Sequence, residues 1–209
     1  MDRSAIILAV DSQGKFSEDK ALLKLDNKPL LNHVVDAVKG MVGEVLVVTA
    51  TNEQADLYSK VVFSANVKFV VNEDEPQMDL AAALTGFEAA QGDYSLVLPL
   101  DAPFVSKEVV SLLFELSQGK SAVVPRWPDC KIEPLHAVYH TGQACEAAKK
   151  ALATGETAVD AIAACMRGVR YVSTMVVEQM NPDFRTFFRV NTAFDLKKAV
   201  AMKKLKRKQ

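Results

Sequence analysis

The chain has 209 residues, of which 49% are hydrophobic and 24% are charged, a balance typical of a soluble globular protein with a substantial core. The net charge of −1 gives no electrostatic basis for general binding to nucleic acid. Three cysteines without a CxxC spacing argue against a disulfide framework or a structural zinc site and favour a reducing cytoplasm.

Short apolar runs rich in β-branched residues recur through the first part of the chain. They span 5–10, 45–50, 67–71, 94–100 and 121–125. Each is short enough for a strand and apolar enough to be covered on both faces. The first run is too short for a signal peptide or a membrane span, so we expect a cytoplasmic protein.

Segments with helical spacing separate these runs. In 29–40 the apolar positions fall on one face, with Pro29 opening the segment and Gly40 closing it. The segments 79–92 and 106–119 have the same pattern, and Ser106 is expected to cap the latter. This alternation predicts an α/β fold, a Rossmann-like three-layer sandwich with a mainly parallel sheet and helices on both faces.

The residues after Pro125 are predicted to form a loop, a strand, a helix broken near Gly155, two short strands and a closing helix. In that order they span 126–134, 135–140, 143–167, 170–174, 187–192 and 193–205. No linker or internal repeat forces a domain boundary. We therefore expect one domain over residues 1–209.

Two predicted strand ends carry side chains suited to phosphate chemistry. Ligands of parallel sheets lie beyond the carboxyl ends of the strands, where the strand order reverses. Asp101 follows the run 94–100 and is well placed for Mg²⁺; helix capping, the alternative role, is already served by Ser106. Lys20 follows Asp19 at the end of the loop after the first run. There it can offset phosphate charge, although an ordinary surface lysine fits the same pattern.

Several segments resemble the molybdenum cofactor guanylyltransferase family. The run from Leu8 to Lys20 is similar to the family's opening L-A-G-G-x-S-x-R-M-G-x-D-K without a gap. KLDNKPLL, LPLDAPFVS, EPLHAVYH and FRVNTAFDL resemble its PLGGKPLL, CDMPFL, QPLFALYR and FNINTPEDL, in the same order. The resemblance spans nearly the whole chain. It implies the nucleotide-diphospho-sugar transferase type of fold, with a nucleotide-binding half at 1–125 and an acceptor-binding half at 126–209.

The resemblance also implies an activity, the Mg²⁺-dependent transfer of GMP from GTP to molybdopterin with release of pyrophosphate. Lys15, Lys20 and Asp101 would carry the chemistry, and Asp101 would bind the metal. The nucleotide would be bound by Leu8, Ala9, Val10, Lys20, Asn52, Asp74 and Asp101. No nucleic acid or membrane partner is implied, and a transient contact with molybdoenzyme maturation proteins is left open.

The chain departs from the family at informative positions. Val10 and Asp11 stand where the family has two glycines, which let backbone N–H groups approach a phosphate. Asp11 would either repel phosphate or add a metal ligand. The stretch 78–82 replaces the family's GPLAG, while Arg189 replaces one asparagine of its NxN and Asn191 matches the other. Two alternatives follow: a nucleotidyltransferase for another base or acceptor, or a catalytically reduced binding or assembly protein in cofactor biosynthesis.

Other polar residues have structural explanations of equal weight or better. Asn52 is equally consistent with a helix N-cap. His136 and His140 lie four apart in a strand-like context, which disfavours a zinc site. Arg126, Trp127 and Lys131, all in the predicted loop 126–134, could form an acceptor pocket; the alternative is a surface loop anchored by the tryptophan.

Overall fold

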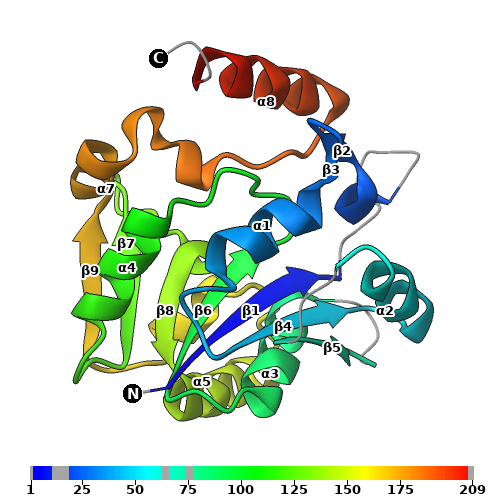
Figure 1. Ribbon diagram of the computed structural model, residues 1–209. Helices are drawn as coiled ribbons and strands as arrows, with labels where there is room; N and C mark the ends of the chain where they lie inside the picture. The colour runs from blue at the N-terminus through cyan, green and yellow to red at the C-terminus, as the bar shows by residue number, and fades with distance from the viewer. Residues whose placement is uncertain (1, 11–18, 63–65, 74–77, 207–209) are drawn as a thin grey trace.

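Figure 1 shows the protein as a computed structural model, which describes residues 2–10, 19–62, 66–73 and 78–206. Within these residues the central sheet has seven strands. They are β1 (Arg3–Ala9), β4 (Glu44–Thr49), β5 (Val67–Val71), β6 (Tyr94–Pro99), β7 (Ala122–Arg126), β8 (Ala137–His140) and β9 (Val169–Ser173). All five apolar runs that the sequence predicts as strands before residue 126 form strands of this sheet.

The sheet is mainly parallel, as predicted. Its spatial order is β5-β4-β1-β6-β8-β7-β9, and among these strands β8 alone runs antiparallel to its neighbours. From β1 the chain builds the sheet through β4 to β5 on one side, and from β6 it builds the other side. The strand order therefore reverses between β1 and β6, which is where open α/β sheets bind their ligands.

Helices cover both faces of the sheet (Figure 1). The helices of the described residues are α1 (Leu30–Val38), α2 (Asn52–Ser59), α3 (Asp79–Ala89), α4 (Lys107–Leu116), α5 (Thr141–Ala153), α6 (Asp160–Ala164), α7 (Thr174–Met180) and α8 (Ala193–Lys206). Ser106 caps α4, as predicted, because its hydroxyl accepts from the Val109 amide. Within the described residues, none of the helices has both the length and the apolar character needed to cross a bilayer.

The core lies in two layers, one on each side of the sheet. Successive residues of β1 alternate between them: Ile7 packs with residues of α1 and α4, and Ile6 packs with residues of α3 and α5. This two-sided burial explains why the strand is apolar throughout. The arrangement is the predicted three-layer sandwich.

A short hairpin follows the first loop, and the sequence patterns did not predict it. Its strands are β2 (Lys24–Leu25) and β3 (Lys28–Pro29), which pair antiparallel. The two residues between them, Asp26 and Asn27, have φ of 58° and 62°. Two central residues with positive φ are the geometry of a tight hairpin turn, and Asp and Asn tolerate it best after glycine.

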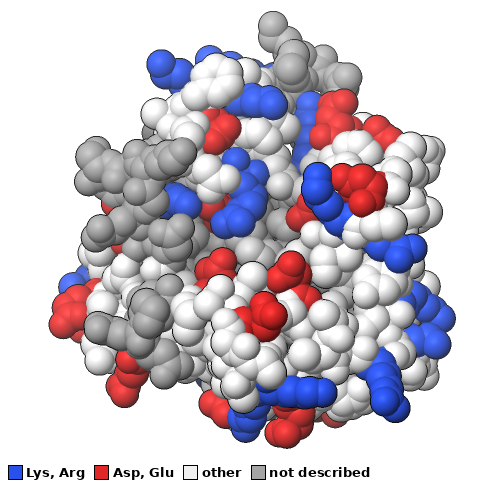
Figure 2. Space-filling view, turned by 180° about the vertical axis from the view of Figure 1, so that it is seen from behind, with Lys and Arg blue, Asp and Glu red and all other residues white. Residues whose placement is uncertain are grey.

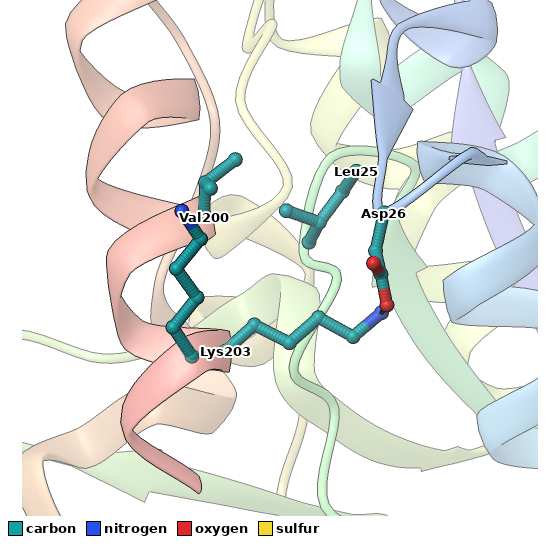
Figure 3. Close-up of a pocket in the computed structure, with 5 residues that line it drawn as sticks. Leu25, Asp26, Val200 and Lys203 are labelled. Carbon is teal, nitrogen blue, oxygen red and sulfur yellow. Dashed lines mark ion pairs between the residues drawn. The ribbon is translucent and has the colours of Figure 1, made fainter. Parts of the chain in front are cut away.

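The C-terminal helix α8 packs on this hairpin. Leu25 is buried with Val190 and Ala199 in a third apolar cluster. Lys203 of α8 extends to Asp26 in the turn, and the two side chains form an ion pair of 3.3 Å (Figure 3). The helix predicted over 193–205 is therefore confirmed, and it covers the hairpin next to the start of α1.

Two strand predictions need correction. The segment 187–192 is not a strand: Phe187 ends the irregular 3-10 segment η3 (Pro182–Phe187), and residues 188–192, which have no regular structure, cross the ends of the sheet strands. Its backbone is held by the Val190 amide, which donates to the Asp101 carbonyl at 2.9 Å. In 135–140 the strand begins at Ala137, because the preceding residues form the 3-10 turn η2 (Pro134–His136).

Candidate active site

The polar side chains of the candidate site gather where β1 and β6 end. The amide of Leu100 donates to the carbonyl of Leu8 at 3.2 Å, which holds the two strand ends side by side. A hollow at this point is lined by Leu8, Asp79, Pro99, Leu100, Asp101, Leu135 and Arg189. The predicted switch point therefore coincides with a polar hollow.

Asp101 and Lys20 meet in this region, as the switch-point argument predicts. Asp101 lies two residues after the end of β6, and its side chain is 1% exposed. Lys20 opens the 3-10 turn η1 (Lys20–Leu22), and its Nζ lies 3.1 Å from Oδ2 of Asp101. Both side chains are buried, so the pair is shielded from solvent. Their chemical roles stay predictions.

Asp19 fixes the start of the turn that presents Lys20. One carboxylate oxygen of Asp19 accepts from the Ala21 amide at 2.9 Å. The other accepts from the Tyr58 hydroxyl of α2 at 2.7 Å. Because η1 is tied to α2 in this way, the Asp19–Lys20 pair in the sequence has a structural explanation: Asp19 positions the turn and Lys20 points to Asp101.

Arg189 is a partner of Asp101 that the sequence reasoning did not predict. Its Nε donates to Oδ1 at 2.7 Å and its Nη2 donates to Oδ2 at 3.2 Å, a bidentate arrangement that a planar guanidinium favours. Asn191, two residues on, accepts a longer contact of 3.4 Å from Lys20. The family resemblance had marked both positions as those of the two asparagines in its NxN.

The buried carboxylate is therefore outnumbered by cations. One negative charge faces the amine of Lys20 and the guanidinium of Arg189, of which only the second is substantially exposed, at 40%. The exposed guanidinium of Arg189 is suited to an anionic ligand such as a phosphate, although a second carboxylate, that of Asp79, lines the same hollow. Figure 2 shows basic and acidic side chains interspersed over the face opposite to that of Figure 1, so on that face any positive potential is local.

The arrangement does not fit a divalent cation as it stands. A carboxylate has about four lone-pair positions, and Lys20 and Arg189 together use three of those on Asp101. Mg²⁺ requires an oxygen at about 2.0–2.1 Å. Among the described residues no group of three or more His, Cys, Asp or Glu side chains is placed to hold a metal. The fourth position belongs to a side chain that is only 1% exposed, so a metal would gain access to Asp101 only if one of its two cations moved.

The stretch 78–82 lies beside the same hollow. Asp79 is the first residue of α3, and it lines the hollow together with Asp101 and Leu8. Ala81 and Ala82 are buried under the sheet. An acidic side chain therefore stands next to the cations in a position where the family pattern has proline.

The remaining predicted nucleotide contacts either do not line the hollow or lie outside the described residues. Ala9 is fully buried, and Val10 is 8% exposed in the core layer beneath α3. Asn52 is exposed at the start of α2, whose cap is Thr51, so the N-cap interpretation of Asn52 is wrong and a nucleotide contact stays a prediction. Lys15, Asp11 and Asp74 lie outside the described residues.

The two histidines have separate environments. His136 is buried in η2 rather than in a strand, and its ring packs edge-on against Phe187. Burial, followed by the positive charge of Arg189, lowers the pKa of His136 to about 3. His140 caps α5 by accepting from the Gln143 amide. His136 is thus a neutral group behind the site at ordinary pH.

The residues proposed for an acceptor pocket each have another partner. The Trp127 ring lies 4.8 Å from Phe184 and 5.9 Å from Phe187 between ring centres, and its Nε1 donates to Glu133 at 2.6 Å. Arg126 lies over the ring of Tyr171, and Lys131 pairs with Asp129. The structural alternative therefore accounts for the tryptophan: it anchors the segment that leads to Arg189.

Comparisons with known proteins identify the family of the chain. The family model of the MobA-like NTP transferase domain matches residues 5–171. A protein of Methanosarcina mazei, named a probable molybdenum cofactor guanylyltransferase, is 31% identical over 98% of this chain and 92% of its own length. A protein of the same name from Methanosarcina acetivorans is 29% identical over 95% of this chain and 90% of its own.

Solved structures show the same fold. Molybdopterin-guanine dinucleotide biosynthesis protein A of Archaeoglobus fulgidus has a TM-score of 0.80 at 20% identity, over 97% of this chain and 99% of the other. The 2-C-methyl-D-erythritol 4-phosphate cytidylyltransferase of Thermus thermophilus has a TM-score of 0.73 at 21% identity, over 98% and 100%. Together with the family match over most of its length, this shows that the chain belongs to the MobA-like NTP transferase family and is a nucleotidyltransferase.

Proposed function

We propose that this protein transfers GMP from GTP to the terminal phosphate of molybdopterin, with release of pyrophosphate, in the cytoplasm. The observation that carries the proposal is the 3.1 Å contact between Lys20 and Asp101 at the switch point of the sheet. The choice of guanine and molybdopterin is supported by the names of the relatives that match nearly the whole chain. The three cysteines are free thiols, which accords with a reducing compartment.

The reaction needs positioning and charge neutralisation more than proton transfer. An ionised oxygen of the acceptor phosphate attacks the α-phosphorus of GTP. The bond from the α-phosphorus to the bridging oxygen breaks, and pyrophosphate leaves with the electron pair. Lys20 would offset the growing negative charge on that leaving group, and the resemblance assigns Lys15 the same role.

Mg²⁺ is the metal of this proposal, and when bound it would neutralise charge on the triphosphate. Asp101 would be its protein ligand. Since two cations occupy Asp101 in the structure, the proposal requires that one of them gives way.

We also propose that the two halves divide the substrates. Residues 1–125 contribute Leu8, Lys20 and Asp101 and would hold the nucleotide. Residues 126–209 contribute Arg189 and Asn191, which contact Asp101 and Lys20, and would hold the acceptor. These contacts support a single reaction centre formed by both halves.

A thermal-shift panel tests the nucleotide assignment. GTP, CTP, ATP and UTP are each added with and without Mg²⁺. A ligand at a hundred times its Kd stabilises the native state by about 2.7 kcal/mol, equivalent to a rise in Tm of about 5–10 °C for a chain of this size. The proposal expects this rise with GTP and Mg²⁺ and formation of the guanine dinucleotide when molybdopterin is added. A rise with ATP or UTP alone would contradict it.

A second candidate, a transferase that uses another base, is favoured by one observation. Asp79 brings a carboxylate into the hollow from the stretch 78–82, where the family pattern has GPLAG. The cytidylyltransferase match also shows that this fold serves more than one base. A response to CTP alone would select this candidate. No response to any nucleotide, together with tight binding of molybdopterin, would select a binding or assembly protein.

A further inference from the structure

Arg189 occupies both oxygens of the carboxylate that the proposed function assigns to the metal. The contacts are 2.7 Å to Oδ1 and 3.2 Å to Oδ2. Lys20 adds a contact of 3.1 Å to Oδ2. Because Asp101 is 1% exposed, water has little access to the lone pair that is left. A guanidinium thus occupies the coordination positions that a cation would need.

The chain around Arg189 is fixed to the same strand end. The amide of Val190 donates to the carbonyl of Asp101 at 2.9 Å, so the residue after Arg189 is tied to Asp101 through the backbone. Just before Arg189, the rings of Phe187 and Phe188 pack against His136 and Phe104. Arg189 is therefore held at Asp101 by its neighbours and is not a surface side chain that reaches it by chance.

We propose that Arg189 competes with the divalent cation for Asp101 and so sets the metal concentration at which this carboxylate becomes a ligand. The inference rests on the proposed function in one respect, that Asp101 is the metal carboxylate. A divalent ion on Asp101 would lie next to the guanidinium and be repelled by it. The family pattern that the sequence resembles has a neutral asparagine at this position, which would not repel the metal.

The experiment measures Mn²⁺ binding to the nucleotide-free protein by electron paramagnetic resonance, with Mn²⁺ as the probe for a hard divalent ion. The variant is Arg189→Asn. The matched control is Arg185→Asn, which removes the same charge from the same segment; Arg185 pairs with Asp183 at 3.8 Å. A second comparison adds Asp101→Asn to Arg189→Asn.

The expected result is a Kd for Mn²⁺ at least roughly tenfold lower in Arg189→Asn than in the native protein, because even in water a divalent ion and a cation at contact distance repel enough to change affinity by that factor. Arg185→Asn should bind Mn²⁺ like the native protein, and the double variant should lose the gain. Equal affinities of Arg189→Asn and the native protein would overturn the inference. So would a gain that survives in the double variant or appears equally in Arg185→Asn.

Folding and substrate identity are controlled separately. Thermal melts establish that each variant is native, and Arg189→Gln, with the same expected gain, replaces Arg189→Asn if the asparagine variant unfolds. No nucleotide is present in the Mn²⁺ measurement. A failed nucleotide panel would therefore count against the proposed function and leave this result standing, whereas an unchanged Mn²⁺ affinity with a normal response to GTP would count against the role of Arg189 alone.

Discussion

Replacing Asp101 with alanine should destabilise the protein by about 3 kcal/mol, besides abolishing transfer. Asp101 is 1% exposed and Lys20 is 4% exposed, so the amine cannot exchange its lost counter-charge for water without local opening. Lys20 and Nη2 of Arg189 both contact Oδ2, at 3.1 and 3.2 Å, and therefore lie no farther apart than the sum of these distances. Without the carboxylate, the two cations face each other.

The magnitude follows from two independent estimates. Two unit charges roughly 6 Å apart repel by about 3 kcal/mol at an effective dielectric constant of 20. Arg189 is 40% exposed and can turn towards water, which relieves part of this repulsion. Removing one partner of a buried pair costs about 3–5 kcal/mol in general, because the other charge is left uncompensated. Both estimates place the loss near 3 kcal/mol.

Urea unfolding gives the free energy of unfolding, and Asp36→Ala is the matched control. Asp36 also contacts two lysines, Lys28 and Lys39, but its side chain is 40% exposed. Its removal should cost less than about 1 kcal/mol, since exposed ion pairs contribute little. If the two variants lose equal stability at unchanged m-values, burial does not govern the energetics of the Asp101 cluster and the reasoning is refuted.

Three further changes test other parts of the structure. Lys20→Met should fold, because Asp101 still accepts hydrogen bonds from Arg189. Its transfer rate should fall by roughly a hundredfold or more in a product-formation assay. A folded variant with full activity would show that Lys20 takes no part in the chemistry. His136 has a pKa of about 3 in the folded protein and 6.5 in the unfolded chain, so each pH unit of acidification between these values destabilises the folded state by about 1.4 kcal/mol. In His136→Phe the urea midpoint should therefore fall less steeply below pH 6.5. An unaltered slope would contradict the burial argument. Gly92→Ala should cost about 1–3 kcal/mol because the added Cβ would lie 2.7 Å from the Ser4 amide nitrogen, whereas Gly40→Ala, with nothing within 4 Å, should be neutral by the same unfolding assay.

Much of the fold could be predicted from the sequence because the central strands are buried on both faces. Such strands appear as short apolar runs, and the helices between them have clear boundary residues, such as Pro29 before α1 and Ser106 before α4. The alternation then fixes a parallel sheet with helices on both sides. The break in the long alanine-rich helix near Gly155 was also predicted, and α5 ends at Ala153.

The missed hairpin and the wrongly predicted strand lie where the local sequence does not show which segment of the chain pairs with them. The hairpin strands Lys24–Leu25 and Lys28–Pro29 are two residues each, too short to show a period. The segment 187–192 alternates like a strand, yet it lies across the strand ends, where the Val190 amide donates to the Asp101 carbonyl. Extended chain with and without a neighbouring strand has the same sequence pattern, so only the tertiary fold separates them.

Part of the candidate site could be predicted because two of its residues follow predicted strands. Lys20 and Asp101 follow strands that the topology brings together at the switch point, and each could be located from its own strand. Arg189 comes from a segment that crosses the sheet, 88 positions after Asp101, and no local pattern predicts its contact. A weak signal was the spacing of Arg189 and Asn191 about the buried Val190, which places both side chains on one side of the chain.

The loss of glycine at position 10 and the presence of Arg189 have related consequences. Val10 is 8% exposed and packs in the core layer that includes Leu8 and Leu80, so its side chain belongs to the interior. A glycine there would favour backbone N–H donors at a phosphate, whereas a guanidinium brings five N–H donors from the other half of the chain. Arg189 would then have opposite effects on the two ligands, because it repels the metal and attracts the phosphates. Its replacement by asparagine should therefore tighten Mn²⁺ binding while weakening the binding of metal-free GTP, and a change of the same sign for both ligands would show that the charge of Arg189 does not act directly on them.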